Sequence, residues 1–144
     1  GVGDFLLAIQ DANLAVIVQT CLEDPRRHHP MAVVPSVASS AVVDMANDFP
    51  DLRVMIAGAK AAELRNLADR ILTLPNVYAD TAQVDGLDVV KVLVDAGLGT
   101  RLVLGSHAPL FIPHAALARV VTDIEDDVAQ VILKDNALRL LNEI

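Results

Sequence analysis

Four short runs rich in Val, Leu and Ile alternate with helical hydrophobic patterns, and this alternation limits the possible folds more than any other feature. The runs cover residues 15–20, 53–57, 76–81 and 101–105. None alternates cleanly between polar and apolar residues, which is typical of strands covered on both faces of a parallel sheet. The sequence therefore predicts an α/β fold of four consecutive parallel βα units.

Helical patterns lie before, between and after these runs. Residues 61–72, for example, place Leu64 and Ile71 on one apolar stripe. We expect Pro35 in the first turn of a helix, where its missing N–H costs nothing, and Asp135 as the N-cap of the last helix. The other helices are expected at residues 4–12, 36–48, 86–96, 113–122, 125–133 and 135–143.

Two architectures fit this order of elements. One is an open doubly wound sheet of four strands, and the other is half of a (β/α)8 TIM-type barrel, which needs about 250 residues when complete. Both join parallel strands by right-handed crossovers, so periodicity does not choose between them. No linker or low-complexity segment divides the 144 residues, which suits a single domain.

The composition excludes several classes of partner. The net charge is −8 and aromatic residues make up 3%, whereas nucleic acids and anionic membranes require clustered Lys and Arg. No apolar run reaches the roughly 18 residues of a membrane span. A single Cys excludes an internal disulfide and favours a reducing, cytoplasmic location. We therefore expect a small-molecule substrate, with neither nucleic acid nor membrane as partner.

Four segments carry a family resemblance. Residues 101–109 read Arg-Leu-Val-Leu-Gly-Ser-His-Ala-Pro, and residues 135–141 read Asp-Asn-Ala-Leu-Arg-Leu-Leu. With residues 49–57 and 74–81, they resemble in order and spacing the last strands and final helix of the amidohydrolase superfamily. The similar branch includes decarboxylases and lactone hydrolases, whose last strand ends Gly-Ser-Asp-x-Pro.

The resemblance covers most of residues 12–143. It implies that residues 1–144 form one partial barrel domain, the C-terminal half of the barrel. The first four strands would then lie outside this chain, together with the family's metal-binding His-x-His pair. The resemblance further implies a hydrolase or decarboxylase that acts on a small molecule with a bound divalent, zinc-like metal.

Three positions of the family's metal site fall within the chain, and all three depart from the family pattern. Gln19 stands where a His is usual, and we expect it either to bind substrate or to hydrogen-bond the loop backbone. Gly58 replaces a second His and is expected to form a tight strand-to-helix turn. His107 replaces the catalytic Asp. We predict it to be catalytic and a tentative metal ligand, the alternative being a structural His at the barrel rim.

The loop after the first strand is the richest polar cluster in the sequence. Glu23, Arg26 and His29 are candidate substrate-binding residues, since loops after barrel strands lie at the functional face. The alternative is a solvated loop with local ion pairs. Asp80, near the end of a later strand, is a further candidate and is expected to orient the site.

Four other residues receive a structural interpretation. Tyr78 and Met55 are expected in the core, and Cys21 is expected to be a buried small residue, since no signature supports a nucleophile. His114 is expected to open a helix as a surface or capping residue.

Three hypotheses about function remain open at this point. The first is a divergent amidohydrolase-like enzyme, and the second is a non-catalytic barrel that binds a small molecule or packs in an assembly. The third, an unrelated open α/β binding domain, would require a Gly-rich loop after an early strand. Gly97 and Gly99 precede a strand and indicate a helix stop instead. A half barrel exposes sheet edges, so we expect a homo-oligomer or a separate N-terminal half as partner.

Overall fold

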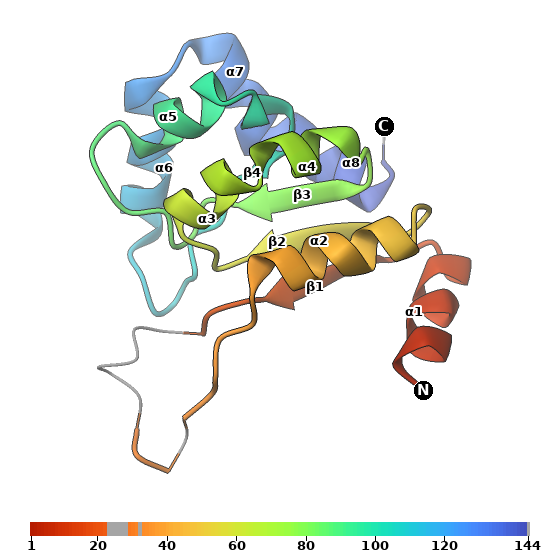
Figure 1. The fold of residues 1–144 in the computed structure, drawn as a ribbon. Coiled ribbons are helices and arrows are strands. Elements are labelled where there is room, and N and C mark those ends of the chain that lie inside the picture. Colours follow the sequence, from red (N-terminus) through yellow and green to blue (C-terminus); the bar gives the residue numbers. More distant parts are fainter. Residues whose placement is uncertain (23–28, 32, 144) are drawn as a thin grey trace.

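The computed structural model describes residues 1–22, 29–31 and 33–143, in which helices and strands alternate along the chain (Figure 1). The strands are β1 (Ala15–Gln19), β2 (Arg53–Ala57), β3 (Val77–Asp80) and β4 (Leu102–Val103). The helices are α1 (Val2–Asp11), α2 (Ser39–Asp48), α3 (Ala61–Asn66), α4 (Ala68–Thr73), α5 (Val89–Asp95), the short 3₁₀ helix η2 (Leu98–Thr100), α6 (Pro113–Asp123), α7 (Asp126–Gln130), the π-helical turn η3 (Val131–Asp135) and α8 (Asn136–Leu141). The predicted succession of four βα units is confirmed. Among the described helices, none is both long and apolar enough to cross a membrane.

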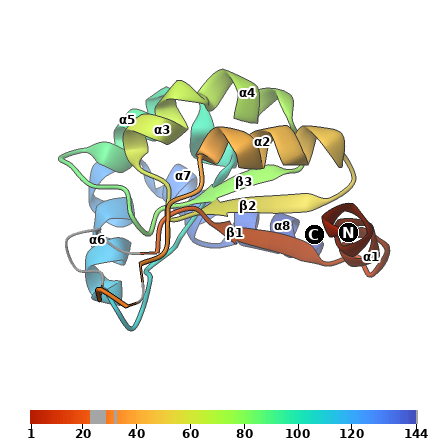
Figure 2. The same ribbon diagram turned by 60° about the horizontal axis from the view of Figure 1, so that its bottom comes forward.

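The four strands form one parallel sheet whose order, β1-β2-β3-β4, is the order of the chain. Helices α2 to α5 lie together on one face of this sheet (Figure 2). Right-handed crossovers between strands that are added in one direction place every crossover helix on the same face. A doubly wound sheet reverses direction and carries helices on both faces. The arrangement is therefore that of consecutive barrel units, and the doubly wound alternative is wrong.

The main core lies between the sheet and the crossover helices. Val54, Ile56 and Val77 point from the strands toward this side and are fully buried. They pack with Val43 of α2 and Leu93 of α5, which are equally inaccessible. Burying one such aliphatic side chain contributes about 1.5–3 kcal/mol. The helix-facing side of the sheet is thus the principal source of stability.

The opposite face of the sheet is only partly covered. There α8 lies on the side of the sheet away from α2 to α5 (Figure 2). Its Leu140 packs against Tyr78 and Val103, with Met55 at the margin. Toward β1 this cover ends, and the side chain of Ile17 is 61% exposed. Burial on both faces is confirmed for β3, whose four residues are all buried, but it is wrong for β1. Tyr78 is buried as predicted, whereas Met55 is half-buried.

Two buried asparagine side chains form hydrogen bonds to the chain segments that lead into β2 and β4. The amide nitrogen of Asn76 donates to the carbonyls of Ala46, Phe49 and Leu52 at 2.9–3.1 Å. Asn136 opens α8, and its amide donates to the carbonyls of Gly99 (2.9 Å) and Leu102 (2.6 Å).

Each amide supplies a donor to neighbouring carbonyls, although the Phe49 carbonyl also accepts from the Leu52 N–H at 3.1 Å. A buried carbonyl left without any donor costs about 1–3 kcal/mol. The Asn in the motifs at 74–81 and 135–141 therefore has a structural role.

Several local predictions are corrected by the structure. Pro35 lies outside α2, which begins at Ser39, so it is not in the first turn of that helix. Asp135 makes no capping hydrogen bond, because α7, η3 and α8 follow one another with helical backbone throughout. The predicted helix over 61–72 is interrupted at Leu67. The helix stop at Gly97 is confirmed by its φ of 87° after α5.

Candidate functional site

The carboxyl ends of the four strands meet at one edge of the sheet, and this edge corresponds to the mouth of a barrel. Gln19 ends β1, Gly58 follows β2, and Asp80 ends β3. His107 lies in the turn after β4. The parallel sheet thus gathers at its mouth all four residues that the sequence singled out at strand ends.

Asp80 is the most constrained ionisable group at this mouth. Its side chain is 7% exposed, and its Oδ1 accepts hydrogen bonds from the backbone N–H of Gly58 (3.0 Å) and of Ala82 (3.2 Å). Gly105 leaves room for the carboxylate, since a Cβ at that residue would lie 2.9 Å from Oδ2. Burial raises the pKa of Asp80 above its ordinary value of 3.8, although the two N–H groups and the charge of His107 oppose this rise.

His107 occupies a strained turn beside Asp80. Its φ is +53°, a left-handed conformation that side-chain-bearing residues adopt infrequently. Its carbonyl accepts hydrogen bonds from the N–H groups of Leu110 (3.0 Å) and Phe111 (3.3 Å), and its half-buried ring lies 5.2 Å from the Phe111 ring. Strained backbone of this kind is held in place by its surroundings and clusters at functional sites. The turn therefore holds His107 at the mouth, within electrostatic reach of the Asp80 carboxylate.

Gln19 and Gly58 are coupled at the ends of β1 and β2. The Gln19 amide nitrogen donates to the carbonyl of Cys21 at 2.6 Å. Gly58 has a φ of +72°, which confirms the predicted tight turn. A Cβ on Gly58 would collide with the Gln19 amide nitrogen and would lie 2.6 Å from the Cys21 carbonyl. The space that a side chain at residue 58 would need is thus filled by the amide of Gln19.

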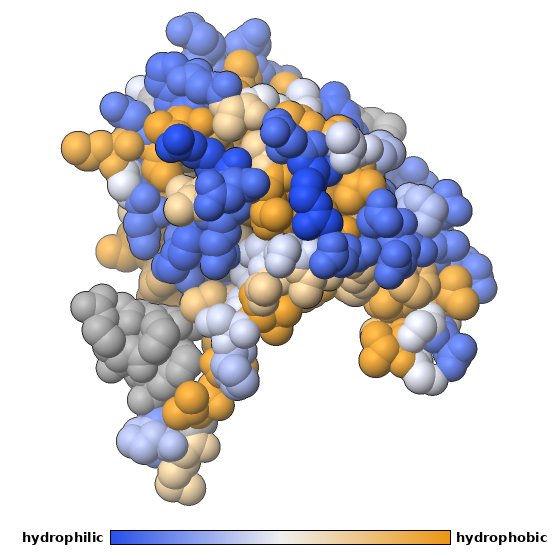
Figure 3. Space-filling model, viewed as in Figure 1, coloured by the Kyte–Doolittle hydropathy of each residue, from blue (hydrophilic) through white to orange (hydrophobic). Residues whose placement is uncertain are grey.

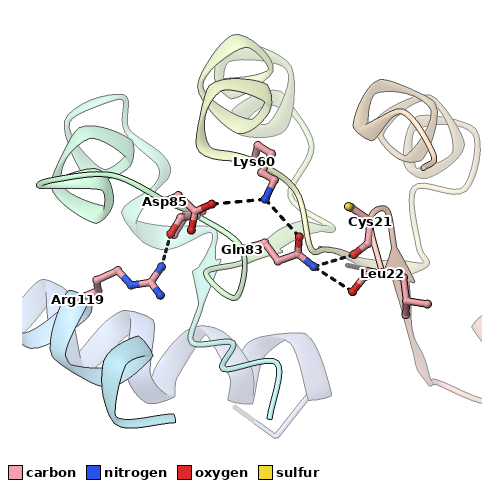
Figure 4. Close-up of polar contacts among 7 residues, drawn as sticks. Cys21, Leu22, Lys60, Gln83, Asp85 and Arg119 are labelled. Carbon is pink, nitrogen blue, oxygen red and sulfur yellow. Dashed lines mark hydrogen bonds and ion pairs between the residues drawn. The ribbon is translucent and has the colours of Figure 1, made fainter. Parts of the chain in front are cut away.

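Gln83 is a site residue that the sequence analysis missed. It is 3% exposed, and its amide nitrogen donates to the carbonyls of Cys21 (2.9 Å) and Leu22 (3.4 Å) (Figure 4). Its amide oxygen accepts a bond from Lys60 Nζ at 3.5 Å, and Lys60 also reaches Asp85 at 3.5 Å. The only signal in the sequence is a glutamine three residues after Asp80. Such a residue can equally lie on the surface or be buried between two loops.

The polar loop after β1 falls mostly outside the described residues. Glu23 and Arg26, both predicted to bind substrate, lie in that part, as do Asp24 and His28. His29 is described, is exposed, and accepts a hydrogen bond at Nδ1 from the Met31 backbone at 3.2 Å.

Two further residues near the mouth were given structural roles from the sequence. Cys21 is half-buried rather than buried. His114 follows Pro113 in the first turn of α6, as predicted, and is exposed.

The described residues do not by themselves fit the divalent metal that the resemblance implies. Within residues 1–22, 29–31 and 33–143, no three His, Cys, Asp or Glu side chains converge in a group that could hold an ion. At the end of β1 stands Gln19, whose amide already donates to a carbonyl, and β2 is followed by Gly58, which has no side chain. His107 and Asp80 are two of the described ionisable groups of the mouth, and without a third ligand beside them they suit proton transfer better than metal coordination.

Comparison with known proteins agrees with the geometry. The model of the family described as Amidohydrolase matches residues 4–142. An uncharacterised TIM-barrel protein from Bordetella bronchiseptica is 18% identical, with a TM-score of 0.72 over 99% of this chain and 50% of that one. A 2,6-dihydroxybenzoate decarboxylase from Rhizobium is 16% identical, with a TM-score of 0.64 over 97% of this chain and 55% of that one.

A third solved structure is a dihydroxybenzoic acid decarboxylase from Polaromonas with bound manganese and an inhibitor. It is 15% identical, with a TM-score of 0.63 over 96% of this chain and 53% of that one. No curated protein is a significant match to this sequence. The chain spans about half the length of these solved structures, as four of eight barrel units should. The chain therefore belongs to the amidohydrolase family and forms the C-terminal half of its (β/α)8 barrel.

Proposed function

We propose that this chain supplies the acid–base half of a divergent amidohydrolase-like enzyme that hydrolyses or decarboxylates a small molecule. The observation that carries the proposal is the Asp80 carboxylate, which is buried at the barrel mouth at the same edge of the sheet as His107. Pairs of ionisable groups in a partly dry site are suited to proton transfer near neutral pH.

The roles of the two residues follow from their surroundings. His107 is half-buried and reaches the mouth, so its imidazole takes a proton from water that attacks a carbonyl. In a decarboxylation, the imidazolium would instead deliver a proton to the carbon that loses carbon dioxide. Asp80 is held by two backbone N–H groups, and its charge stabilises the protonated imidazole. The proposal assigns Gln19 to shaping the pocket, since its amide nitrogen is already engaged.

The remaining groups of the site would come from an N-terminal half of the barrel. The described residues do not fit a metal, so no step here passes through one. Two of the solved neighbours are named as decarboxylases of dihydroxybenzoic acids, which makes small aromatic carboxylates the first substrates to try. We place the protein in the cytoplasm, consistent with its acidic composition and single Cys.

The alternative is a non-catalytic barrel that binds a small molecule. The filled position beside Gly58 favours it, because the Gln19 amide occupies the space that a ligand side chain at the end of β2 would need. In that case His107 would be a binding residue and not a catalytic one.

Kinetics on the natural full-length protein separate the two functions. Dihydroxybenzoates, simple lactones and phenyl esters serve as probes, with carbon dioxide release or acid release as the signal. We expect His107→Ala to lower kcat by about 100-fold or more with little change in KM, as for loss of a general base. His107→Gln keeps a hydrogen-bonding group of similar size and should be equally inactive. The non-catalytic alternative would be established if the wild-type protein bound a probe without turning it over and the His107→Ala variant still bound the same probe.

A further inference from the structure

The loop after β3 contacts the segments that follow the first two strands. The Gln83 amide nitrogen donates to the carbonyls of Cys21 (2.9 Å) and Leu22 (3.4 Å), which follow β1. Lys60, which follows β2, lies 3.5 Å from both the Gln83 amide oxygen and the Asp85 carboxylate (Figure 4). Gln83 therefore has partners from two other βα units, one on each side of its amide.

The same loop contacts the fourth unit through α6. Arg119 of this helix, which follows β4, donates to the carbonyl of Val84. Val84 is fully buried and Arg119 is half-buried, so this hydrogen bond is partly shielded from water. The loop after β3 is therefore in contact with the segments that follow all three of the other strands.

Gln83 is buried in spite of its polar side chain. The outer surface over α3 and α4 is largely hydrophilic (Figure 3), whereas Gln83 is 3% exposed. A buried amide is costly unless it is hydrogen-bonded, and here both the nitrogen and the oxygen have partners. A reversed amide would place its oxygen against two carbonyl oxygens and its nitrogen against the Lys60 ammonium. The contacts thus favour a single orientation of this side chain.

The Cys21 carbonyl connects Gln83 to the residues of the mouth. It accepts a hydrogen bond from Gln19 at 2.6 Å as well as the one from Gln83. On the other side, the N–H of Ala82, the neighbour of Gln83, donates to Asp80 Oδ1 at 3.2 Å. The strands β1 and β3 do not pair with each other, because β2 lies between them. Gln83 therefore supplies a direct link between the ends of β1 and β3 that the sheet itself does not provide.

We propose that Gln83 is a positioning residue, which fixes the end of β1 relative to Asp80 across the mouth of the barrel. A substrate that lies against the end of β1 is then presented at a constant distance to Asp80 and His107. A displacement of about 1 Å in such a site can lower the rate by about 100-fold. This catalytic consequence rests on the proposed function, whereas the link between β1 and β3 does not.

Native-state hydrogen exchange, measured by NMR on the natural full-length protein, tests the link without a substrate. Gln83→Met keeps the length of the side chain but donates no hydrogen bond. The amides of Thr20 and Val37 report on the end of β1, since they donate to the carbonyls of Ala57 and Thr20, each at 2.8 Å. We expect both amides to exchange about 2- to 10-fold faster in the variant, as for the loss of one hydrogen bond. The core amide of Val54 should exchange as in the wild type.

Two further variants show which atoms of Gln83 matter. Gln83→Glu keeps an oxygen for Lys60 but cannot donate to the carbonyls after β1, so it should accelerate the same two amides. Lys60→Ala is the matched control, because it removes the contact at the Gln83 oxygen and leaves both donated bonds. It should leave the exchange of Thr20 and Val37 unchanged.

Three results would overturn the proposal. The first is unchanged exchange of the Thr20 and Val37 amides in either variant of Gln83. The second is an equal acceleration at Val54, which would mean that Gln83 stabilises the whole fold and not the end of β1. The third is an effect of Lys60→Ala as large as that of Gln83→Met, which would assign the link to the ammonium group.

Kinetics on the same protein test the catalytic consequence, with dihydroxybenzoates and phenyl esters as probes. Gln83→Met should lower kcat by about 10-fold or more and leave the shape of the pH–rate profile unchanged, because Asp80 and His107 are both retained. Asn76→Ala is a destabilising control at the opposite end of β3 and should keep its kcat. A normal kcat in an active Gln83→Met variant would refute the positioning role. A wild-type protein without turnover of any probe, but with the expected change in exchange, would count against the proposed function alone.

Discussion

The helix-facing core and the mouth of the sheet follow different rules. In the core, the side chains of Val54, Ile56 and Leu102 are fully buried and belong to one apolar cluster. At the mouth, Gln19 and Asp80 each end a strand, and the side chain of each has specific polar partners. A pattern of apolar residues is therefore enough to specify the core, in which one apolar side chain resembles another. The contacts at the mouth depend instead on the identity of single residues.

A large-to-small change in the core should have the largest effect. Ile56→Ala removes a fully buried side chain and leaves a cavity, so we expect the free energy of unfolding to fall by about 3–4 kcal/mol. Urea denaturation measures this change. Ile56→Val is the matched control and should cost about 1 kcal/mol. A loss for Ile56→Ala no greater than that of the control would show that this side of the sheet is not the main core.

Asn76→Ala tests whether a polar residue outside the mouth can matter as much as an apolar one. The variant leaves the carbonyls of Ala46, Phe49 and Leu52 without their common donor, so we expect a loss of about 2 kcal/mol. Asn76→Asp should be at least as harmful, because its oxygens cannot donate. Stability within about 0.5 kcal/mol of wild type would refute the role of the amide.

At the mouth, Gly58→Ala should cost about 1–3 kcal/mol, since its φ is +72° and its Cβ would meet Gln19 and the Cys21 carbonyl. The double variant with Gln19→Ala should recover part of this loss, because one of the two obstacles is gone. Thermal unfolding of the single and double variants measures the coupling. Strict additivity would mean that Gln19 does not occupy the space beside Gly58.

Asp80→Asn should affect stability least among the mouth variants, and in the opposite direction. Burial raises the pKa of Asp80 in the folded state, so its ionisation destabilises the fold as pH rises above 3.8. Asparagine keeps an oxygen for Gly58 and Ala82 without the charge. We expect a Tm equal to or above wild type at pH 7, with the difference vanishing as pH falls toward 3.8. A variant less stable than wild type at pH 7 would show that the charge itself is needed.

Lys91→Ala serves as the control for both regions. Lys91 forms an exposed ion pair with Asp95 on α5, at 2.7 Å. Exposed pairs contribute little, so neither Tm nor activity should change measurably. A clear effect would mean that α5 contacts something outside the described chain.

The sequence was sufficient for the order of βα units, because β-branched runs and helical stripes are repeated along the chain. It could not choose the barrel over the doubly wound sheet, since that choice depends on the direction in which strands are added. The family motifs made that choice instead. The motifs did not reveal that the side chains of Asn76 and Asn136 hydrogen-bond to the loops beside the strands.

At the mouth, sequence reasoning correctly selected Gln19, Gly58, Asp80 and His107 as residues that follow strands. The contacts among them could not be predicted, because they depend on side-chain directions across three neighbouring strands. The role of Gln83 could not be predicted either, because its partners Cys21 and Lys60 are distant from it in the sequence.

The packing of Gln19 against Gly58 makes the two positions interdependent. A side chain at residue 58 would meet the Gln19 amide and the Cys21 carbonyl, so it could be accommodated only if residue 19 changed as well. An engineer who wished to place a metal ligand at the end of β2 would therefore have to redesign the end of β1 in the same step.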